Sequence, residues 1–487
     1  MADLTVSLED GLAREARERP DAPAILGLNG PIAFADLDRR GDVAAAGLAA
    51  RGIGPGTCVA IALPRGADGL ALVHGLLRLG APFVPLDPAM PIAERDAVAR
   101  ATRAEWTVAS GPGGAAGAGT LVLDDDWWAD SATRPTAPRP DLPAAAPALF
   151  VRSSGTTRGS PKIALWSRAY LWRSASSSMR KSDPHGARYL CVIDLRFGVG
   201  LRTALRTLWS GGAIVLPPPL RRPEDLQSAI RDHGCNVGFF VPAMLRELSA
   251  VPRAAPFMPE LDPLSVGTGA TTPLDRRVFR ERLSPNLAIS MGTNEVGGVF
   301  ALPSRHPKID QPGAVGFPIG NIECVLIDGR GEPVPAGTIG ALKVRAPGMP
   351  TGYLDGTADE DTGFRDGWFH TGDLMVMDAD GCFHHRGRID DEIDVGGQKM
   401  HPEEVEAVLA EHPDVVESAV VAWPGLRGSV PVAFVVLRRP VEPGLLRRHC
   451  ADHLPAFKIP RRFRVVDRLP RNDAGKVMRR ALRDSPR

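Results

Sequence analysis

The segment SSGTTRGSPKIA, Ser153 to Ala164, carries many side chains that could bind an oxygen-rich ligand. It holds serine and threonine hydroxyls, glycines and the cations Arg158 and Lys162, and it has no apolar face that could join a core. The apolar run ALFVR, which predicts a strand, leads directly into it. Backbone N–H groups and hydroxyls in such a loop can donate hydrogen bonds to phosphate oxygens, and a lysine adds positive charge. The segment therefore predicts a phosphate-binding loop, with a surface turn as the alternative.

The Walker phosphate loop, G-x-x-x-x-G-K-[ST], does not describe this segment. Lys162 follows Pro161, and Ile163 stands where a serine or threonine is required. A kinase or hydrolase that used the loop would release ADP and phosphate, and this enzyme class remains a rival interpretation.

Four more segments place charged side chains beside glycines or at the ends of expected strands. They are MGTNE (Met291 to Glu295), GWFHTGDL (Gly367 to Leu374), GRIDDEIDVGGQKMHPEEVE (Gly387 to Glu406) and LPRNDAGKVMRRAL (Leu469 to Leu482). Each has an ordinary alternative: a surface carboxylate for Glu295, a turn-capping aspartate in a tight Thr-Gly turn for Asp373 and a solvated lysine for Lys476. Taken together and in this order, with GAPFVPLDPAMP and PGAVGFPIG, they resemble the adenylate-forming (ANL) superfamily. This superfamily includes acyl-CoA synthetases, adenylation domains that load carrier proteins, and luciferase, and the resemblance covers essentially the whole chain.

The resemblance implies an ATP-dependent ligase. A carboxylate attacks the α-phosphate of ATP, pyrophosphate leaves, and the thiol of CoA or of a carrier protein's phosphopantetheine arm displaces AMP from the acyl adenylate. Since the reacting groups are anionic, the site must neutralise charge as the reaction proceeds. An amine or another nucleophile could take the acyl group instead, and a non-catalytic nucleotide-binding relative is a further alternative.

The resemblance also implies roles for individual residues. The β- and γ-phosphates would be held by Ser153, Ser154, Gly155, Thr156, Thr157 and Lys162. The adenine side would be formed by Met291, Gly292, Thr293 and Asn294. Glu295 and Thr157 would bind Mg²⁺, which prefers oxygen ligands.

Three residues would act on the ribose and on the reacting groups. Asp373 would accept hydrogen bonds from both ribose hydroxyls, and Arg388 would lie beside the ribose and phosphate. Lys476, one of only seven lysines in the sequence, would contact the substrate carboxylate and the α-phosphate. Lys476, Arg388 and Glu295 are the predicted catalytic residues.

The sequence departs from the superfamily pattern at three places. Three residues, Arg158 to Ser160, separate Thr157 from Pro161, where the family usually has two. Met291 stands where an aromatic residue usually stacks on adenine, and Asn294 replaces a usual threonine. The segment VIDLRFGVGLRTAL lacks the gating histidine of many CoA-forming members, although Phe197 could serve.

The predicted acid pocket combines aromatic residues and glycines, which suits a small aromatic or short acyl acid. It comprises Asp194, Arg196, Phe197, Phe240, Gly267, Gly269 and Ala270, with Phe239 as an alternative to Phe240. Asp194 could bind a substrate amine or be a structural residue at a strand end, and Arg196 could face a second acidic group on the substrate.

The elements that must position these residues follow an α/β pattern. Helical stretches alternate with short apolar runs from Ile32 to about residue 325, which predicts layers of helices on largely parallel sheets. Short strands with glycine turns between Asn321 and Val344 predict a small β-rich part. We therefore expect an N-terminal adenylation core, residues 1–387, and a small mobile α+β domain, residues 388–487. Asp390 would be the hinge between them, and the Gly396-Gly397 turn would approach the thiol donor.

Composition excludes several other classes of protein. The chain has 487 residues and a net charge of +1, so nucleic acid is not an expected partner. Six cysteines lie far apart, without the spacing of a zinc site or a disulfide framework, which fits a reducing cytoplasm. His74 and Arg78 interrupt the most apolar stretch, so neither a membrane span nor a membrane partner is expected. The expected partners are a small carboxylic acid and, if the acceptor is a carrier protein, a separate one acting in trans.

Overall fold

The computed structural model describes residues 10–27, 30–62, 66–109, 119–152, 162–175, 183, 185–217, 222–251, 256–354, 363–425, 428–471 and 477–484. Five predicted loop residues, Ser153 to Thr157, lie outside the described residues, as does the predicted catalytic Lys476.

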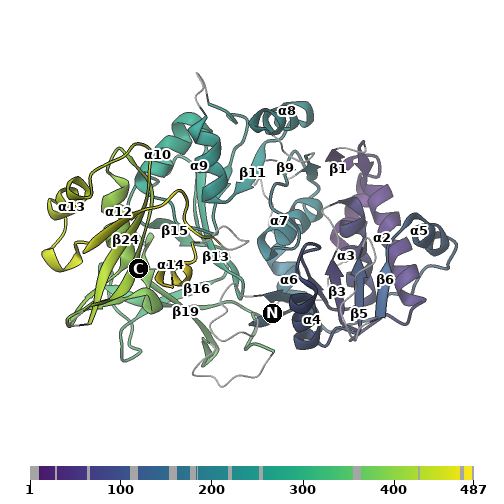
Figure 1. Ribbon diagram of the computed structural model, residues 1–487. Coiled ribbons are helices and arrows are strands. Elements are labelled where there is room, and N and C mark those ends of the chain that lie inside the picture. Colours follow the sequence, from purple (N-terminus) through teal and green to yellow (C-terminus); the bar gives the residue numbers. More distant parts are fainter. Residues whose placement is uncertain are drawn as a thin grey trace.

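In the described residues the largest sheet has 14 strands, and its pairing changes from parallel to antiparallel at β13. Figure 1 shows β13 near the middle of the molecule. Its parallel part runs in the order β1 (Pro23–Gly27), β10 (Ala213–Leu216), β9 (Arg188–Leu190), β11 (Val237–Phe240), β12 (Leu264–Val266) and β13 (Leu287–Thr293), with the short β2 (Ile32–Ala33) antiparallel at its edge. The antiparallel part continues with β14 (Gly297–Leu302), β15 (Ala314–Pro318), β20 (Phe383–Arg388), β19 (Trp368–Met377), β17 (Ile339–Arg345) and β16 (Glu323–Ile327). The short β18 (Phe364–Arg365) pairs with β19 outside this order. The predicted β-rich part is thus an extension of the main α/β sheet.

A second, six-stranded sheet ends in the hairpin that carries the predicted phosphate loop. Its order is β6 (Gly119–Val122), β5 (Trp106–Ala109), β3 (Val59–Ala62), β4 (Phe83–Pro85), β7 (Pro147–Arg152) and β8 (Ile163–Ser167). Strands β7 and β8 are antiparallel, and Arg152 is the register partner of Ile163. The loop between them therefore starts and ends at one edge of the sheet.

Helices fill the space between the two sheets and cover their outer faces. One apolar core joins both sheets to α1 (Asp10–Glu18), α2 (Phe34–Ala49), α3 (Ala67–Leu79), α5 (Asp125–Ala132), α6 (Arg168–Ala175) and α7 (Gly198–Trp209). A second core on the outer face of the large sheet holds α8 (Pro223–His233), α9 (Pro242–Ala250) and α10 (Pro273–Arg282). On the outer face of the six-stranded sheet lies α4 (Ile92–Thr102). Every residue of α3 from Gly69 to Leu79 is buried, as expected for a helix enclosed by two sheets.

Strands between two cores show which side chain faces which layer. In β11, Phe239 belongs to the core between the sheets, whereas Phe240 is fully buried in the outer core. This follows from the alternation of side chains along a strand. Because both faces are apolar, the sequence of such a strand carries no polar alternation that would reveal its orientation.

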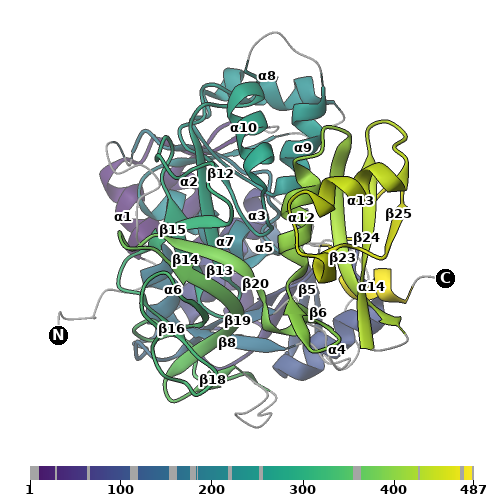
Figure 2. The same ribbon diagram turned by 90° about the vertical axis from the view of Figure 1, so that its left-hand side faces the viewer.

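The C-terminal residues form a smaller α+β unit beside the large sheet (Figure 2). It contains η1 (Ile389–Asp391), the hairpin β21 (Ile393–Val395) and β22 (Gln398–Met400), α12 (Pro402–Ala410), β23 (Val415–Gly425), β24 (Gly428–Leu437), α13 (Pro443–Ala451), η2 (Ala456–Lys458), β25 (Arg462–Val465) and α14 (Arg479–Arg483). Arg388 is the last residue of β20, and β21 belongs to a different sheet, so we keep residues 1–387 and 388–487 as the proposed division. In the part of the chain that the structure describes, no helix combines the length and apolarity needed to cross a bilayer.

Candidate active site

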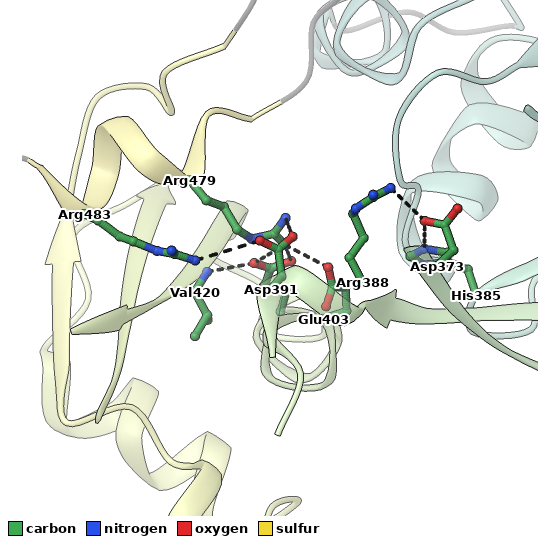
Figure 3. Close-up of polar contacts among 9 residues, drawn as sticks. Asp373, His385, Arg388, Asp391, Glu403, Val420, Arg479 and Arg483 are labelled. Carbon is green, nitrogen blue, oxygen red and sulfur yellow. Dashed lines mark hydrogen bonds and ion pairs between the residues drawn. The ribbon is translucent and has the colours of Figure 1, made fainter. Parts of the chain in front are cut away.

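Asp373 and Arg388 lie directly opposite each other on the paired strands β19 and β20 (Figure 3). The Arg388 guanidinium donates from Nη1 to Asp373 Oδ1 at 3.1 Å, and His385 Nε2 lies 3.3 Å from the same oxygen. Burial opposes ionisation of Asp373, but the hydrogen bond and electrostatic interaction with His385 and the positive charge of Arg388 outweigh it, so the pKa of this carboxyl lies below its usual range. Asp373 is therefore a buried carboxylate that stays ionised at neutral pH.

The segment around Asp373 is not the tight turn expected from its Thr-Gly-Asp sequence. It lies inside β19, where Gly372 adopts a positive φ of 77°. A Cβ on Gly372 would come within 2.9 Å of Arg388 Nη2, so the glycine leaves room for the guanidinium. Its role here is close approach between two strands rather than chain reversal.

Glu295 is buried at the turn between β13 and β14 and has a neutral hydrogen-bond partner. Tyr353 donates its hydroxyl to Glu295 Oε1 at 2.7 Å, and Trp166 Nε1 donates to the Glu295 backbone carbonyl at 3.1 Å. Among the described residues, no cation forms an ion pair with this carboxylate. A buried carboxylate without a cation is costly, which fits a site that receives a metal ion.

The two ends of the predicted phosphate loop contact this same region. Asn294 donates its side-chain amide to the carbonyl of Arg152, the last residue before the loop, at 2.7 Å. Lys162, just after the loop, has its Nζ 5.4 Å from the centre of the Tyr353 ring. The asparagine that replaces the family's usual threonine therefore ties β13 to the start of the loop.

A cavity of about 70 Å³ opens beside Gly292, Thr293 and Asn294. Strands β7, β8, β11, β13 and β14 and the start of α7 surround it, and its wall comprises Leu149, Val151, Trp166, Gly198, Val199, Arg202, Phe239, Thr268, Ser290, Gly292, Thr293, Asn294, Gly297 and Gly298. Its position next to the predicted nucleotide residues makes it the candidate acid pocket. A single water needs roughly 10–15 Å³, so there is space for a small acid only.

Several residues predicted for the acid pocket lie elsewhere. The prediction that Phe240 lines the pocket is wrong, because Phe240 packs in the outer core. The alternative, Phe239, lines the cavity instead. Met291, which was predicted for the adenine side, packs against the core between the sheets and does not line this cavity. Gly267, Gly269 and Ala270 flank Thr268 without lining the cavity themselves. A Cβ on Gly267 would come within 2.8 Å of the Phe239 ring, so this glycine makes space for that wall.

Asp194, Arg196 and Phe197 precede α7 and also do not line this cavity. Asp194 accepts a hydrogen bond from the Arg196 backbone N–H at 3.0 Å, which favours the structural alternative for this aspartate. The Arg196 guanidinium is paired with Asp87 at 2.5 Å and lies 4.8 Å from the centre of the Phe197 ring. An arginine already paired in this way is not free to meet a second acidic group on the substrate.

The predicted hinge leads into a cluster of ionic contacts (Figure 3). Asp390 lies exposed in η1, and its neighbour Asp391 is 3.4 Å from Arg479 of α14. Arg479 also contacts Glu403 at 3.1 Å and Glu406 at 2.8 Å. Burial raises the pKa of Glu406 to about 7; Arg479 opposes that rise and Glu403 adds to it.

Two further C-terminal segments have predicted roles in the reaction: the Gly396-Gly397 turn and the segment that contains Lys476. Gly396 and Gly397 form the turn between β21 and β22, both with positive φ. Arg471 and Val477 form an isolated antiparallel bridge, which brings together the two ends of the segment that contains Lys476.

Sequence reasoning missed three side chains that the fold brings to the candidate site: Tyr353, His385 and Arg202. Thr268 lies within the segment from Gly267 to Ala270 that was predicted to line the acid pocket, and it does line the cavity. The strand pairing of the GWFHTGDL and GRIDD segments is the signal that could have found His385.

Comparison with known proteins agrees with this geometry. Residues 12–354 match the family described as AMP-binding enzyme, and residues 404–476 match the AMP-binding enzyme C-terminal domain. The chain is similar to a 2-succinylbenzoate–CoA ligase of Bacillus licheniformis, with 29% identity over 97% of this chain and 98% of the relative. It is 30% identical to a sulfoacetate–CoA ligase of Cupriavidus necator, over 97% of this chain and 96% of the relative.

The fold also matches a solved structure, that of ATP-bound MatB from Rhodopseudomonas palustris. The TM-score is 0.88, with 26% identity and 98% of each chain covered. The chain therefore belongs to the AMP-binding enzyme family of the adenylate-forming superfamily, and it is an adenylate-forming ligase.

Proposed function

We propose that this ligase uses ATP and Mg²⁺ to convert a small carboxylic acid to its acyl adenylate and then passes the acyl group to a thiol. The observation that carries the proposal is the buried, ionised Asp373 held between Arg388 and His385. On the same sheet, Glu295 and the ends of the phosphate loop meet at the β13–β14 turn.

Asp373 and Arg388 would bind the sugar end of the nucleotide. Arg388 and His385 both contact Oδ1 of Asp373, and neither contacts Oδ2, which can accept hydrogen bonds from the ribose hydroxyls. The Arg388 side chain is 44% exposed, so its guanidinium can also reach an anionic phosphate.

The β13–β14 turn would position the phosphates. Glu295 would hold Mg²⁺, with Tyr353 fixing the orientation of the carboxylate through its hydroxyl. Bound Mg²⁺ would neutralise charge on the phosphate oxygens. Lys162 and the loop residues from Ser153 to Thr157 are proposed to bind the departing pyrophosphate, and Lys476 to bridge the acid and the α-phosphate.

The names of the relatives support CoA as the acceptor, whereas a carrier-protein thiol or an amine requires a direct test. The two relatives act on different acids by name, so they do not select the acid.

Exchange of labelled pyrophosphate into ATP, measured with a panel of acids, tests the first step. We expect exchange with one class of acid, loss of exchange in Lys476→Ala, and AMP as the product when CoA is added. Release of ADP, or exchange without any acid, would contradict the proposal. Parallel assays with CoA, a phosphopantetheinylated carrier protein and hydroxylamine as acceptors identify the nucleophile.

A further inference from the structure

The wall of the acid cavity contains a positive charge that no described residue neutralises. Arg202 lies on α7, four residues after Gly198, and residues four apart lie on the same face of a helix. Both residues belong to the cavity wall. Within the described parts of the chain, the Arg202 guanidinium makes neither a hydrogen bond nor an ion pair, and its Nε is buried. The cavity wall that these parts form contains no acidic side chain.

The electrostatic surroundings of Arg202 do not remove its charge. Burial lowers the pKa of Arg202 to about 10, and Arg206 acts in the same direction, while Tyr170 opposes them. The Tyr170 phenol is not an anion here, because its hydroxyl donates to the Val296 carbonyl at 2.6 Å and burial raises its pKa. Arg202 therefore stays protonated at neutral pH, and no residue in the described parts of the chain acts as its counter-ion.

Other arginines of this region do have partners. Arg196 is paired with Asp87, and Arg206, one turn after Arg202, donates to the Ser174 carbonyl at 3.2 Å. Buried arginines are normally paired, because an isolated buried charge is unfavourable. Arg202 is partly buried with a buried Nε, and among the described residues it has no such partner, which indicates that a ligand in the cavity supplies one.

Two neighbouring residues, Gly297 and Thr268, shape the cavity around the Arg202 guanidinium. A Cβ on Gly297, which has a φ of 77°, would lie 2.5 Å from Arg202 Nη1. Thr268, on the same cavity wall, holds an unusual positive φ of 67°, and its buried hydroxyl has no hydrogen-bond partner. A β-branched residue in this conformation is strained, and such strain is concentrated at ligand sites. Two unsatisfied polar groups of the wall thus face one small cavity.

We propose that the acid activated by this enzyme carries a second anionic group, and that Arg202 binds this group with a hydrogen bond from the Thr268 hydroxyl. This inference rests on the proposed adenylation reaction and specifies its substrate class as short dicarboxylic acids. Arg202 is thus a residue that determines specificity, and it takes the role that the sequence suggested for Arg196.

Matched pairs of acids test the substrate class. Pyrophosphate exchange is measured with malonate, succinate and glutarate, each against the monocarboxylate of equal chain length, and with phthalate against benzoate. We expect one dicarboxylate to exceed its partner at least 100-fold in kcat/KM. Equal or better exchange with monocarboxylates overturns the inference and leaves the proposed function intact.

Substitutions of Arg202 test the residue. Arg202→Met is expected to lower kcat/KM for the dicarboxylate by at least 100-fold, mainly through KM, and to reverse the preference for the diacid. Arg202→Lys should restore part of it. Arg206→Met is the matched control on the same helix, and the preference for the diacid should survive it. A loss in Arg202→Met that is equal for both acids of a pair contradicts the assignment.

A binding measurement separates the two proposals. Thermal unfolding is followed with and without the dicarboxylate in the presence of ATP and Mg²⁺. The unliganded Arg202→Met protein should melt at or above the wild-type temperature, because an unpaired buried charge has been removed, and it should lose the stabilisation by diacid. Diacid stabilisation that depends on Arg202 but occurs without exchange would disprove adenylation while supporting the anion site. The absence of exchange with every acid of the panel, together with the absence of stabilisation by every diacid, rejects both proposals.

Discussion

Asp373 illustrates how one side chain can be prepared for a ligand by its neighbours. Arg388 and His385 keep the carboxylate ionised despite burial. Arg388 and His385 both contact Oδ1 of Asp373, so Oδ2 can accept hydrogen bonds from a ligand. In the proposed role at the ribose, the charge and orientation of Asp373 would be fixed before the nucleotide binds.

Replacing Asp373 with Asn should weaken ATP binding by roughly 10- to 100-fold, because charge-assisted hydrogen bonds are lost and Arg388 loses its partner. Calorimetric titration with ATP measures the change. Asp130→Asn, at an exposed ion pair of α5, serves as the control and should bind ATP normally. Unchanged affinity in Asp373→Asn would remove this residue from the nucleotide site.

The contact between Tyr353 and Glu295 predicts a graded metal dependence. Tyr353→Phe removes the hydroxyl that orients the carboxylate, and Glu295→Gln removes the negative charge itself. We expect a several-fold higher Mg²⁺ requirement in the first variant and a larger increase in the second. Titration of the exchange rate with Mg²⁺ provides the measurement, with Tyr189→Phe on β9 as the matched control. An identical Mg²⁺ response in wild type and Glu295→Gln would exclude Glu295 as a metal ligand.

At this scale the motifs predicted part of the site. Asp373, Arg388 and Glu295 were identified from type and order, since their segments have a recognisable local pattern. Arg202 was missed, because an arginine in an amphipathic helix ordinarily reaches solvent. Its unpaired state depends on residues far apart in sequence, such as Gly297 and Thr268, and a single sequence does not show which of them meet.

Among the elements, β11 shows where sequence patterns lose their predictive value. The run VGFF is apolar at every position because a core lies on each side of the strand. The strand itself is easily predicted, but the face on which Phe239 or Phe240 lies is decided by the neighbouring layers. The helices and strands could be predicted from periodicity, and the orientation of the pocket aromatics could not.

The start of β14 allows a comparison of adjacent glycines. Gly297→Ala forces a side chain into a positive φ and against Arg202, whereas a Cβ on Gly298 meets only Ile319 closely, at 3.1 Å. We expect Gly297→Ala to lower the free energy of unfolding by about 1–3 kcal/mol and to raise KM for the acid. Gly298→Ala should change both quantities less. Urea unfolding measures the change in stability of the two variants, and pyrophosphate exchange measures the change in KM. Larger effects in Gly298→Ala than in Gly297→Ala would show that the positive φ of Gly297 is not essential.

Helix α3 predicts a dependence of stability on pH. Its His74 is fully buried, and burial, with a smaller contribution from Arg78, lowers its pKa to about 3. Below about pH 6.5 the unfolded chain binds a proton at His74 and the folded chain does not. The free energy of unfolding is therefore unaffected by His74 above pH 6.5 and decreases as the pH falls from 6.5 towards 3. The slope should be about 1.4 kcal/mol per pH unit. Urea unfolding of the N-terminal domain should show a flatter profile for His74→Leu than for wild type, with the exposed His453→Gln as the control. Parallel profiles for His74→Leu and wild type would refute this assignment.

For the whole molecule, a small set of contacts joins the two parts of the chain. Arg246 of α9 lies 3.4 Å from Glu417 of β23, and Glu417 also pairs with Arg471 at 2.6 Å. Arg471 also forms the isolated bridge with Val477. Arg471 and Val477 are thereby linked to helix α9 of the N-terminal part.

Glu417→Gln should loosen this link and increase the mobility of the C-terminal domain. We expect faster amide hydrogen exchange at residues 389–395 in the variant, because fewer contacts oppose movement about the proposed hinge. Glu411→Gln, at the end of α12, is the control. Unchanged exchange at the hinge in Glu417→Gln would show that other contacts hold the domain.

The overall organisation was predicted more fully than its connections. Alternating helices and strands predicted a layered α/β domain followed by a small α+β domain, and the structure agrees. The joining of β19 and β20 to the parallel strands through β15 and β14 was not predicted, because long-range strand order leaves no local trace in the sequence.

The Arg479 cluster has a consequence for limited proteolysis. Through Arg479 and Arg483, helix α14 contacts Asp391, which lies just after the chain leaves the large sheet. Arg479 also pairs with Glu403 and Glu406. A cut just before Arg479 would therefore leave three neighbouring carboxylates without this cation, and their mutual repulsion would destabilise the start of the C-terminal unit.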